Sequence, residues 1–161
     1  MSVSAARGAR VSGRLDDALF VAIGLSWTAG FVHVAACSSH LDEYAPFAVA
    51  FALLAAVQFG WGVLAYRRPT RALLVAGALL SVGTVAVWLL SRTTGLPFGP
   101  EAWQPEPWGL PDTVASADEL TLVALLVAGR LHRGIRGTFI AVGVVLVLLS
   151  SLTLVTGGHS H

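Results

Sequence analysis

The sequence predicts an all-α integral membrane protein, a bundle of five transmembrane helices with its N-terminus in the cytoplasm and its C-terminus outside. Hydrophobic residues make up 55% of the chain and charged residues 12%, roughly half the charged fraction of a typical soluble domain. The charges stand in short clusters, and the apolar runs between them are about 20 residues long, enough to cross a bilayer. The arginines also divide unevenly between the two sides of such a bundle, which gives its orientation.

The whole chain is one membrane domain flanked by two short tails. Residues 1–16 are small, polar and basic, and we expect them to form a flexible cytoplasmic tail. The predicted spans cover about 17–37, 45–66, 72–90, 112–130 and 138–156. The outer tail, 157–161, follows the last span. Most of the length is therefore spent on membrane spans, and little is left for a soluble domain.

Proline and tryptophan mark the connections between the spans. Pro69 ends the second helix, because proline has no N–H to continue the hydrogen-bond ladder. The one long connection, 91–111, holds five of the seven prolines and cannot be helical. Its Trp103 and Trp108 suit the membrane interface, where one side of the ring meets lipid and the other meets water. The fourth span is the least apolar, and the fifth is almost wholly aliphatic.

The arginine count decides the orientation. With a cytoplasmic N-terminus, nine of the ten basic residues face the cytoplasm: three in 1–16, three in 67–71 and three in 130–136. Only Arg92 lies outside. Short loops rich in arginine stay on the cytoplasmic side, so the predicted location is the plasma (inner) membrane.

A competing interpretation concerns Val34–Cys37. Basic residues, an apolar stretch and then Val-Ala-Ala-Cys also resemble a bacterial lipoprotein signal, in which the cysteine becomes the lipidated N-terminus. Asp16 and Asp17 argue against it, because they stand where the positive region of a signal should meet its apolar core. His33 also interrupts that core. We therefore expect an uncleaved first span.

Ligand-capable side chains gather at the outer end of the first span. Along this span, small residues recur at every fourth position (Ala18, Ala22, Ser26 and Gly30) and form a ridge that lets another helix approach closely. At about 100° per residue, three further side chains project near that ridge: His33, Cys37 and His40. Glu43 could join them from the helix end. Imidazole, thiolate and carboxylate suit zinc or copper, although such histidines can equally bind carbonyls at the interface and a lone cysteine can pack as a small hydrophobe.

Three further charged residues are candidates for ligand binding: Arg92, Asp112 and Glu119. Glu119 lies near mid-membrane, about 16 Å from the inner edge at 1.5 Å per residue, where a carboxylate facing lipid costs on the order of 3 kcal/mol. It should therefore face the bundle, either as a functional group or hydrogen-bonded to Gln58, Ser26 or a backbone carbonyl. Asp112 shares its helix face, whereas Asp118 points about 100° away. Arg92 could pair with Glu43, Asp112 or Glu119, or bind an anionic ligand.

The run from Trp88 to Pro100, followed by Gly109, Asp112 and Glu119, resembles a group of small multi-pass membrane proteins from GC-rich bacteria. The spacing of His40 and Glu43 and the position of Gln58 are also similar. The resemblance covers the first four spans. The group has no established activity, so the resemblance implies residence in the membrane and no particular chemistry.

The functional expectation is an outward-facing polar cavity that binds a metal ion, with zinc or copper as the candidates, or a small polar ligand. The alternative is a structural accessory or assembly subunit of a larger membrane complex, in which these residues hold helices together. No nucleophile elbow, phosphate loop, nucleotide fingerprint or zinc-protease motif is present, so no catalytic residue is assigned. A third hypothesis is an intramembrane enzyme with Glu119 as general base, but nothing in the sequence supplies its nucleophile or oxyanion donors. The expected partners are the lipid bilayer and other membrane subunits, with no nucleic acid.

Overall fold

Over the residues that it describes, the computed structural model is an all-α bundle of five helices, which confirms the all-α class and the five predicted helices. The structure describes residues 3–128 and 133–157, and the side chains of 17–127 and 137–152. The helices are α1 (Val3–His40), α2 (Ala45–Arg67), α3 (Arg71–Thr93), α4 (Leu110–Ala128) and α5 (Arg133–Gly157). Three of them contain segments long and apolar enough to cross a membrane: Asp17–His40, Ala45–Arg67 and Arg71–Thr93.

Several helix ends differ from the prediction by three residues or more. The helix α1 ends at His40 rather than Cys37, and α5 begins at Arg133 rather than at 138. The helix α1 begins at Val3, so residues 3–16 lie in a helix rather than in the expected tail. Arginine, alanine and leucine favour helix, and no proline interrupts this stretch. The helix α3 continues to Thr93, three residues beyond the expected end, because the first proline comes only at Pro97.

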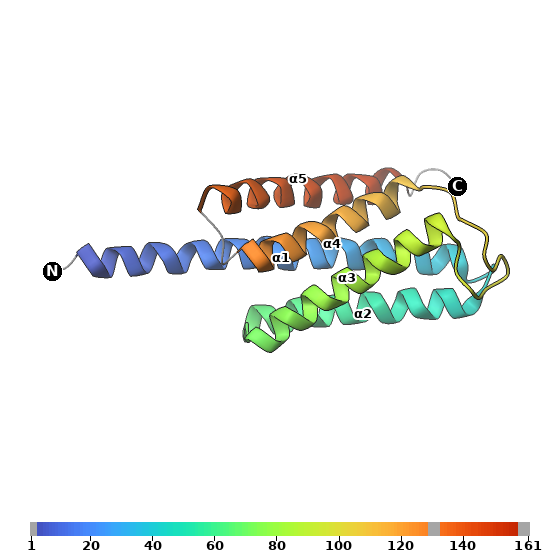
Figure 1. The fold of residues 1–161 in the computed structure, drawn as a ribbon, viewed down its shortest axis with the longest axis horizontal. Helices are drawn as coiled ribbons and strands as arrows, with labels where there is room; N and C mark the ends of the chain where they lie inside the picture. Colours follow the sequence, from blue (N-terminus) through green and yellow to red (C-terminus); the bar gives the residue numbers. More distant parts are fainter. Residues whose placement is uncertain (1–2, 129–132, 158–161) are drawn as a thin grey trace.

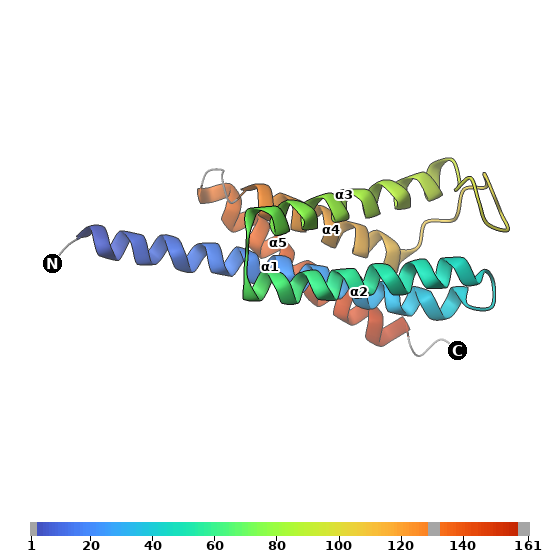
Figure 2. The same ribbon diagram turned by 90° about the horizontal axis from the view of Figure 1, so that it is seen from below.

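The helix α1 is the centre of the bundle. It packs against α2, α4 and α5, while α3 packs mainly against α4 (Figure 1). One end of the bundle, here called the turn end, holds the short turn between α2 and α3. The other end, here called the loop end, holds the connection 94–109 between α3 and α4. The helices α2 and α3 diverge from the turn end toward the loop end, and α5 crosses the bundle obliquely (Figure 2).

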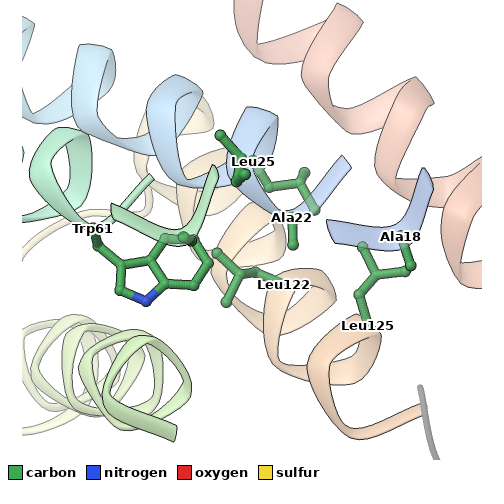
Figure 3. Packing of buried hydrophobic residues seen from close by; sticks show 8 residues of the cluster. Ala18, Ala22, Leu25, Trp61, Leu122 and Leu125 are labelled. Carbon is green, nitrogen blue, oxygen red and sulfur yellow. The ribbon is translucent and has the colours of Figure 1, made fainter. Parts of the chain in front are cut away.

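The apolar core occupies the half of the bundle at the turn end. Ala18, Ala22 and Leu25 of α1 meet Trp61 of α2 and the leucines of α4, Leu122 and Leu125 (Figure 3). The small side chains of α1 allow this close approach, as the ridge of small residues predicted. The Trp61 indole N–H donates to the carbonyl oxygen of Leu73 at 2.8 Å, so α3 is fixed to α2 in this half.

Candidate functional site

At mid-depth all five helices contribute a polar side chain to one buried layer. Its centre is the adjacent pair Asp118 and Glu119 on α4, which are 0% and 2% exposed. The layer is completed by residues from the other four helices: Ser26 and Thr28 of α1, Gln58 of α2, Ser81 of α3 and Ser150 of α5. We call this set the mid-membrane layer, after the depth that the sequence predicts for Glu119.

The two acids of the layer point in different directions, as their adjacent positions on a helix predicted. The Gln58 amide donates to the Glu119 carboxylate, and the Ser81 hydroxyl also approaches it. The Thr28 and Ser150 hydroxyls lie 2.9 and 2.6 Å from Oδ2 of Asp118. Glu119 therefore joins α4 to α2 and α3, whereas Asp118 joins it to α1 and α5. The bond to Gln58 was one of the predicted alternatives for Glu119.

The second polar group lies at the loop end and is centred on Arg92. Its guanidinium donates to the carboxylates of Glu106 and Asp112. The Arg92 side chain is only 7% exposed, while the two carboxylates are 38% and 37% exposed. The Glu106 amide also donates to the Ser91 carbonyl oxygen, so this group fastens the connection 94–109 to α3 and α4. We call Arg92, Glu106 and Asp112 the loop-end cluster.

Pairing with Asp112 was among the predicted alternatives for Arg92, but Glu106 was not predicted. Its segment has no periodicity, and nothing in its spacing shows which way a carboxylate in an irregular connection will turn. Two local features shape the connection around Glu106. Pro105 and Pro107 flank Glu106, and Gly95 and Gly99 take φ values of +75° and +101°, which glycine adopts without steric cost. These residues fold the connection back over α3.

The proposed metal ligands are not brought together. His33 and His40 both stack on the ring of Phe51, with centroid separations of 5.7 and 5.3 Å and nearly parallel planes. Since seven residues of helix rise about 10.5 Å, Phe51 lies between the two imidazoles. His40 Nδ1 pairs with Glu43 at 3.0 Å, and Cys37 is a half-buried free thiol. Within the part of the chain that the structure describes, no three His, Cys, Asp or Glu side chains are placed to hold a metal ion.

Polar side chains of α1 and α4 form a column between the loop-end cluster and the mid-membrane layer. Asp112 lies close enough to His33 to interact with it electrostatically. One turn below His33, a Cβ built on Gly30 would lie 3.1 Å from the Phe59 ring and 3.5 Å from Gln58 Oε1. On α4, the buried Ser116 stands between Asp112 and Glu119 on the same helix face. Among the predicted site residues, His33, Arg92, Asp112 and Glu119 therefore border one column, whereas Cys37, His40 and Glu43 lie outside it.

Between mid-depth and the loop end, several buried polar side-chain atoms have no hydrogen-bond partner. Among the described residues they are His33 Nε2, Gln58 Oε1, Trp88 Nε1, Arg92 Nε and Asp118 Oδ1. Most buried polar side-chain atoms in proteins are paired, so each exception needs an explanation. All five lie in the mid-membrane layer or nearer the loop end, and none belongs to the apolar core.

The comparisons with known proteins identify no relative. No protein-family model matches the chain, and no curated protein or solved structure is significantly similar to it. The arrangement of the site is therefore the basis for a functional argument.

Proposed function

We propose that this chain is a five-span plasma-membrane protein, with a cytoplasmic N-terminus and an outer C-terminus, that binds a small polar molecule in a pocket entered from the outside. In this orientation the turn end is cytoplasmic and the loop end faces outward. The single observation that carries the proposal is the set of four unpartnered buried polar atoms from the loop-end cluster to the mid-membrane layer, which belong to His33, Gln58, Trp88 and Arg92. Such atoms are costly to bury unless something supplies their hydrogen bonds.

The character of these atoms indicates the chemistry of the ligand. Near the loop end they are nitrogens: the Arg92 Nε–H and the Trp88 Nε1–H are donors, and His33 Nε2 is a donor in one of its tautomers. Trp88 lies one turn from Arg92 on the same face of α3. Three nitrogens of this kind favour a ligand with acceptor oxygens, such as carbonyl or hydroxyl groups.

The charges argue against an anion. In the loop-end cluster, one guanidinium faces the two carboxylates of Glu106 and Asp112, which leaves one negative charge in excess. Glu119 adds a further acid below it. An anionic ligand would be repelled by this field, because like charges in a water-poor site interact strongly. The proposed ligand is therefore a neutral molecule that carries oxygen acceptors.

Cysteine accessibility tests the pocket in the full-length protein. In a Cys37→Ser background, a cysteine at Ser116 faces the column, one at Leu120 lies on the exposed face of α4, and one at Ala22 lies in the apolar core. Thiols react with charged, membrane-impermeant reagents only where water reaches them. We expect reagent added outside intact cells to label Ser116→Cys and to spare Leu120→Cys and Ala22→Cys. If Ser116→Cys is spared as well, there is no outward-facing pocket.

The ligand itself is sought by mass spectrometry of small molecules released from the purified protein. We expect a neutral, oxygen-bearing compound in stoichiometric amount from the wild type. It should be lost from His33→Phe, which keeps a ring against Phe51 but removes the imidazole nitrogens. Val34→Phe, on the exposed face of the same helix, is the matched control and should retain it.

A second candidate is the accessory subunit of a larger membrane complex. The exposed face of α3 favours this candidate. Only 11% of the most apolar stretch of this helix is buried in the bundle, and large apolar side chains such as Leu79 and Val87 are exposed. A photoreactive residue at Leu79 distinguishes lipid from protein around this face. Reproducible crosslinking to one membrane protein, together with an unlabelled Ser116→Cys, would favour this candidate over the binding pocket.

A further inference from the structure

We propose that Asp118, Thr28 and Ser150 form a binding site for an alkali-metal cation such as sodium, between α1, α4 and α5 at mid-depth. This site lies on the side of α4 away from Gln58 and is independent of the ligand pocket proposed above.

Oxygen atoms from three helices gather at this carboxylate. Thr28 Oγ1 and Ser150 Oγ lie 2.9 and 2.6 Å from Asp118 Oδ2. Thr28 Oγ1 also lies 3.2 and 3.0 Å from the carbonyl oxygens of Gly24 and Leu25. The other carboxylate oxygen, Asp118 Oδ1, is buried and has no hydrogen-bond partner, and the residue is 0% exposed. The site therefore combines a fully buried carboxylate, one oxygen of which has no partner, with two hydroxyl groups at its other oxygen.

The Thr28 hydroxyl has a single proton for three acceptors, namely two carbonyl oxygens and Asp118 Oδ2. When it donates to the carbonyl of its own helix, its lone pairs face the carboxylate. Two oxygen acceptors then lie side by side, which is unfavourable unless a positive charge sits beside both of them. A bound cation supplies that charge.

No side chain supplies it in the part of the chain whose ion pairs are described. The pairs found there join His40 to Glu43 and Arg92 to Glu106 and Asp112. An ionised carboxylate in the membrane interior is strongly disfavoured without a counter-charge. Asp118 must therefore carry a proton or hold a cation.

The ligand atoms select the kind of cation. Carboxylate, hydroxyl and carbonyl oxygens suit hard cations, whereas zinc and copper prefer nitrogen and sulfur. Calcium takes six to eight oxygens and commonly several carboxylates, but only one carboxylate faces this site, because Glu119 turns to Gln58 and Ser81. One negative charge with neutral oxygens around it matches a monovalent ion, as in the sodium sites of membrane transporters.

The test uses the purified full-length protein in detergent. Its unfolding midpoint is measured at constant pH and ionic strength while choline chloride is replaced by sodium chloride. A ligand that binds only the folded state stabilises it, and at about ten times the dissociation constant we expect a rise of about 4 °C. Binding of radioactive sodium to the wild type should approach one ion per chain. Thr28→Val and Ser150→Ala should lose the rise, and Ser151→Ala, on the exposed side of α5, should keep it.

The opposing result is equally clear. If sodium and choline give the same midpoint, no radioactive sodium is retained, and the midpoint follows pH alone, Asp118 holds a proton and the proposal is wrong. The direct binding measurement needs no variant, so it stands even if a substitution prevents folding. His33→Phe separates the two proposals, because it should abolish ligand binding and leave the sodium response unchanged.

Discussion

In the half of the bundle at the turn end, the buried cluster is apolar, whereas from mid-depth to the loop end the same helices bury charged and polar side chains. Ala22 and Leu25 pack against Leu122 in the first half. One to three turns nearer the loop end on the same helices, Thr28 contacts Asp118 and His33 lies near Asp112. In lipid, helices gain nothing by hiding apolar surface from one another, so shape fit and polar contacts must hold them together. The half at the turn end is held together by shape fit, and the half at the loop end by polar contacts. A bundle closed at one end and polar at the other fits a pocket better than a channel.

The largest expected effect tests the shape fit of the first half. A Cβ added at Gly77 of α3 would overlap the ring of Trp61, which is 5% exposed and bonded to Leu73, whereas one added at Gly83 on the same helix meets open space. Overpacking a closed site costs about 1–3 kcal/mol. We expect Gly77→Ala to lose about 2 kcal/mol of unfolding free energy and Gly83→Ala to be neutral or slightly stabilising. Equal effects in equilibrium unfolding in detergent would mean that this half is loosely packed.

The next effect tests the polar contacts of the mid-membrane layer. Gln58→Leu removes the amide that donates to Glu119 and leaves a buried carboxyl group without that bond. A buried group left without its partner costs about 1–3 kcal/mol. We expect a loss near 1.5 kcal/mol, against no change for Val57→Leu on the exposed face of α2. A neutral Gln58→Leu in the same unfolding assay would show that the contact does not hold α2 to α4.

The smallest effect is expected at the loop-end cluster. Glu106 and Asp112 are more than a third exposed, so water and salt weaken their pairs with Arg92. Arg92→Gln should cost at most about 1 kcal/mol, but it should release the connection 94–109 and speed its cleavage by protease. Glu101→Gln, an exposed position in that connection, is the control. Equal cleavage rates for the two variants would show that the cluster does not fasten the connection.

The sequence predicted the helices well because proline and arginine mark their ends. It predicted less well which helix is central. The most apolar of the candidate spans, α3, is 11% buried, while the least apolar of them, α1, is 56% buried. The mean hydropathy of a helix measures its affinity for lipid, so the most apolar helix lies at the periphery of the bundle. The informative signal was the ridge of small residues on α1, which lets neighbours approach on that side.

The site could be predicted only in part. Glu119 and Asp112 were found because an acid in an apolar run is conspicuous, and the bond to Gln58 was a stated alternative. Asp118 was set aside for pointing away from Glu119. Its partners Thr28 and Ser150 could not be singled out from the sequence, because Ser26 stands two residues before Thr28 and Ser151 directly follows Ser150. The proposed metal ligands do not converge. Spacing along one helix predicts which side chains share a face, but it does not predict which residue of the neighbouring helix packs against them. Here Phe51 of α2 fills the space between the two histidines. The zinc or copper prediction is left without structural support.

The central claim is that α4, the helix that carries both buried acids, crosses the membrane. It is not one of the three helices that contain a segment long and apolar enough to do so by length and composition alone. In a Cys37→Ser background, single cysteines at Glu101 and at Leu131, which lies outside the described residues, bracket this helix in the full-length protein. An impermeant maleimide added to intact cells should label Glu101→Cys and leave Leu131→Cys unlabelled until the membrane is opened. Labelling of both from outside would contradict the five-span account and remove Asp118 and Glu119 from the membrane interior.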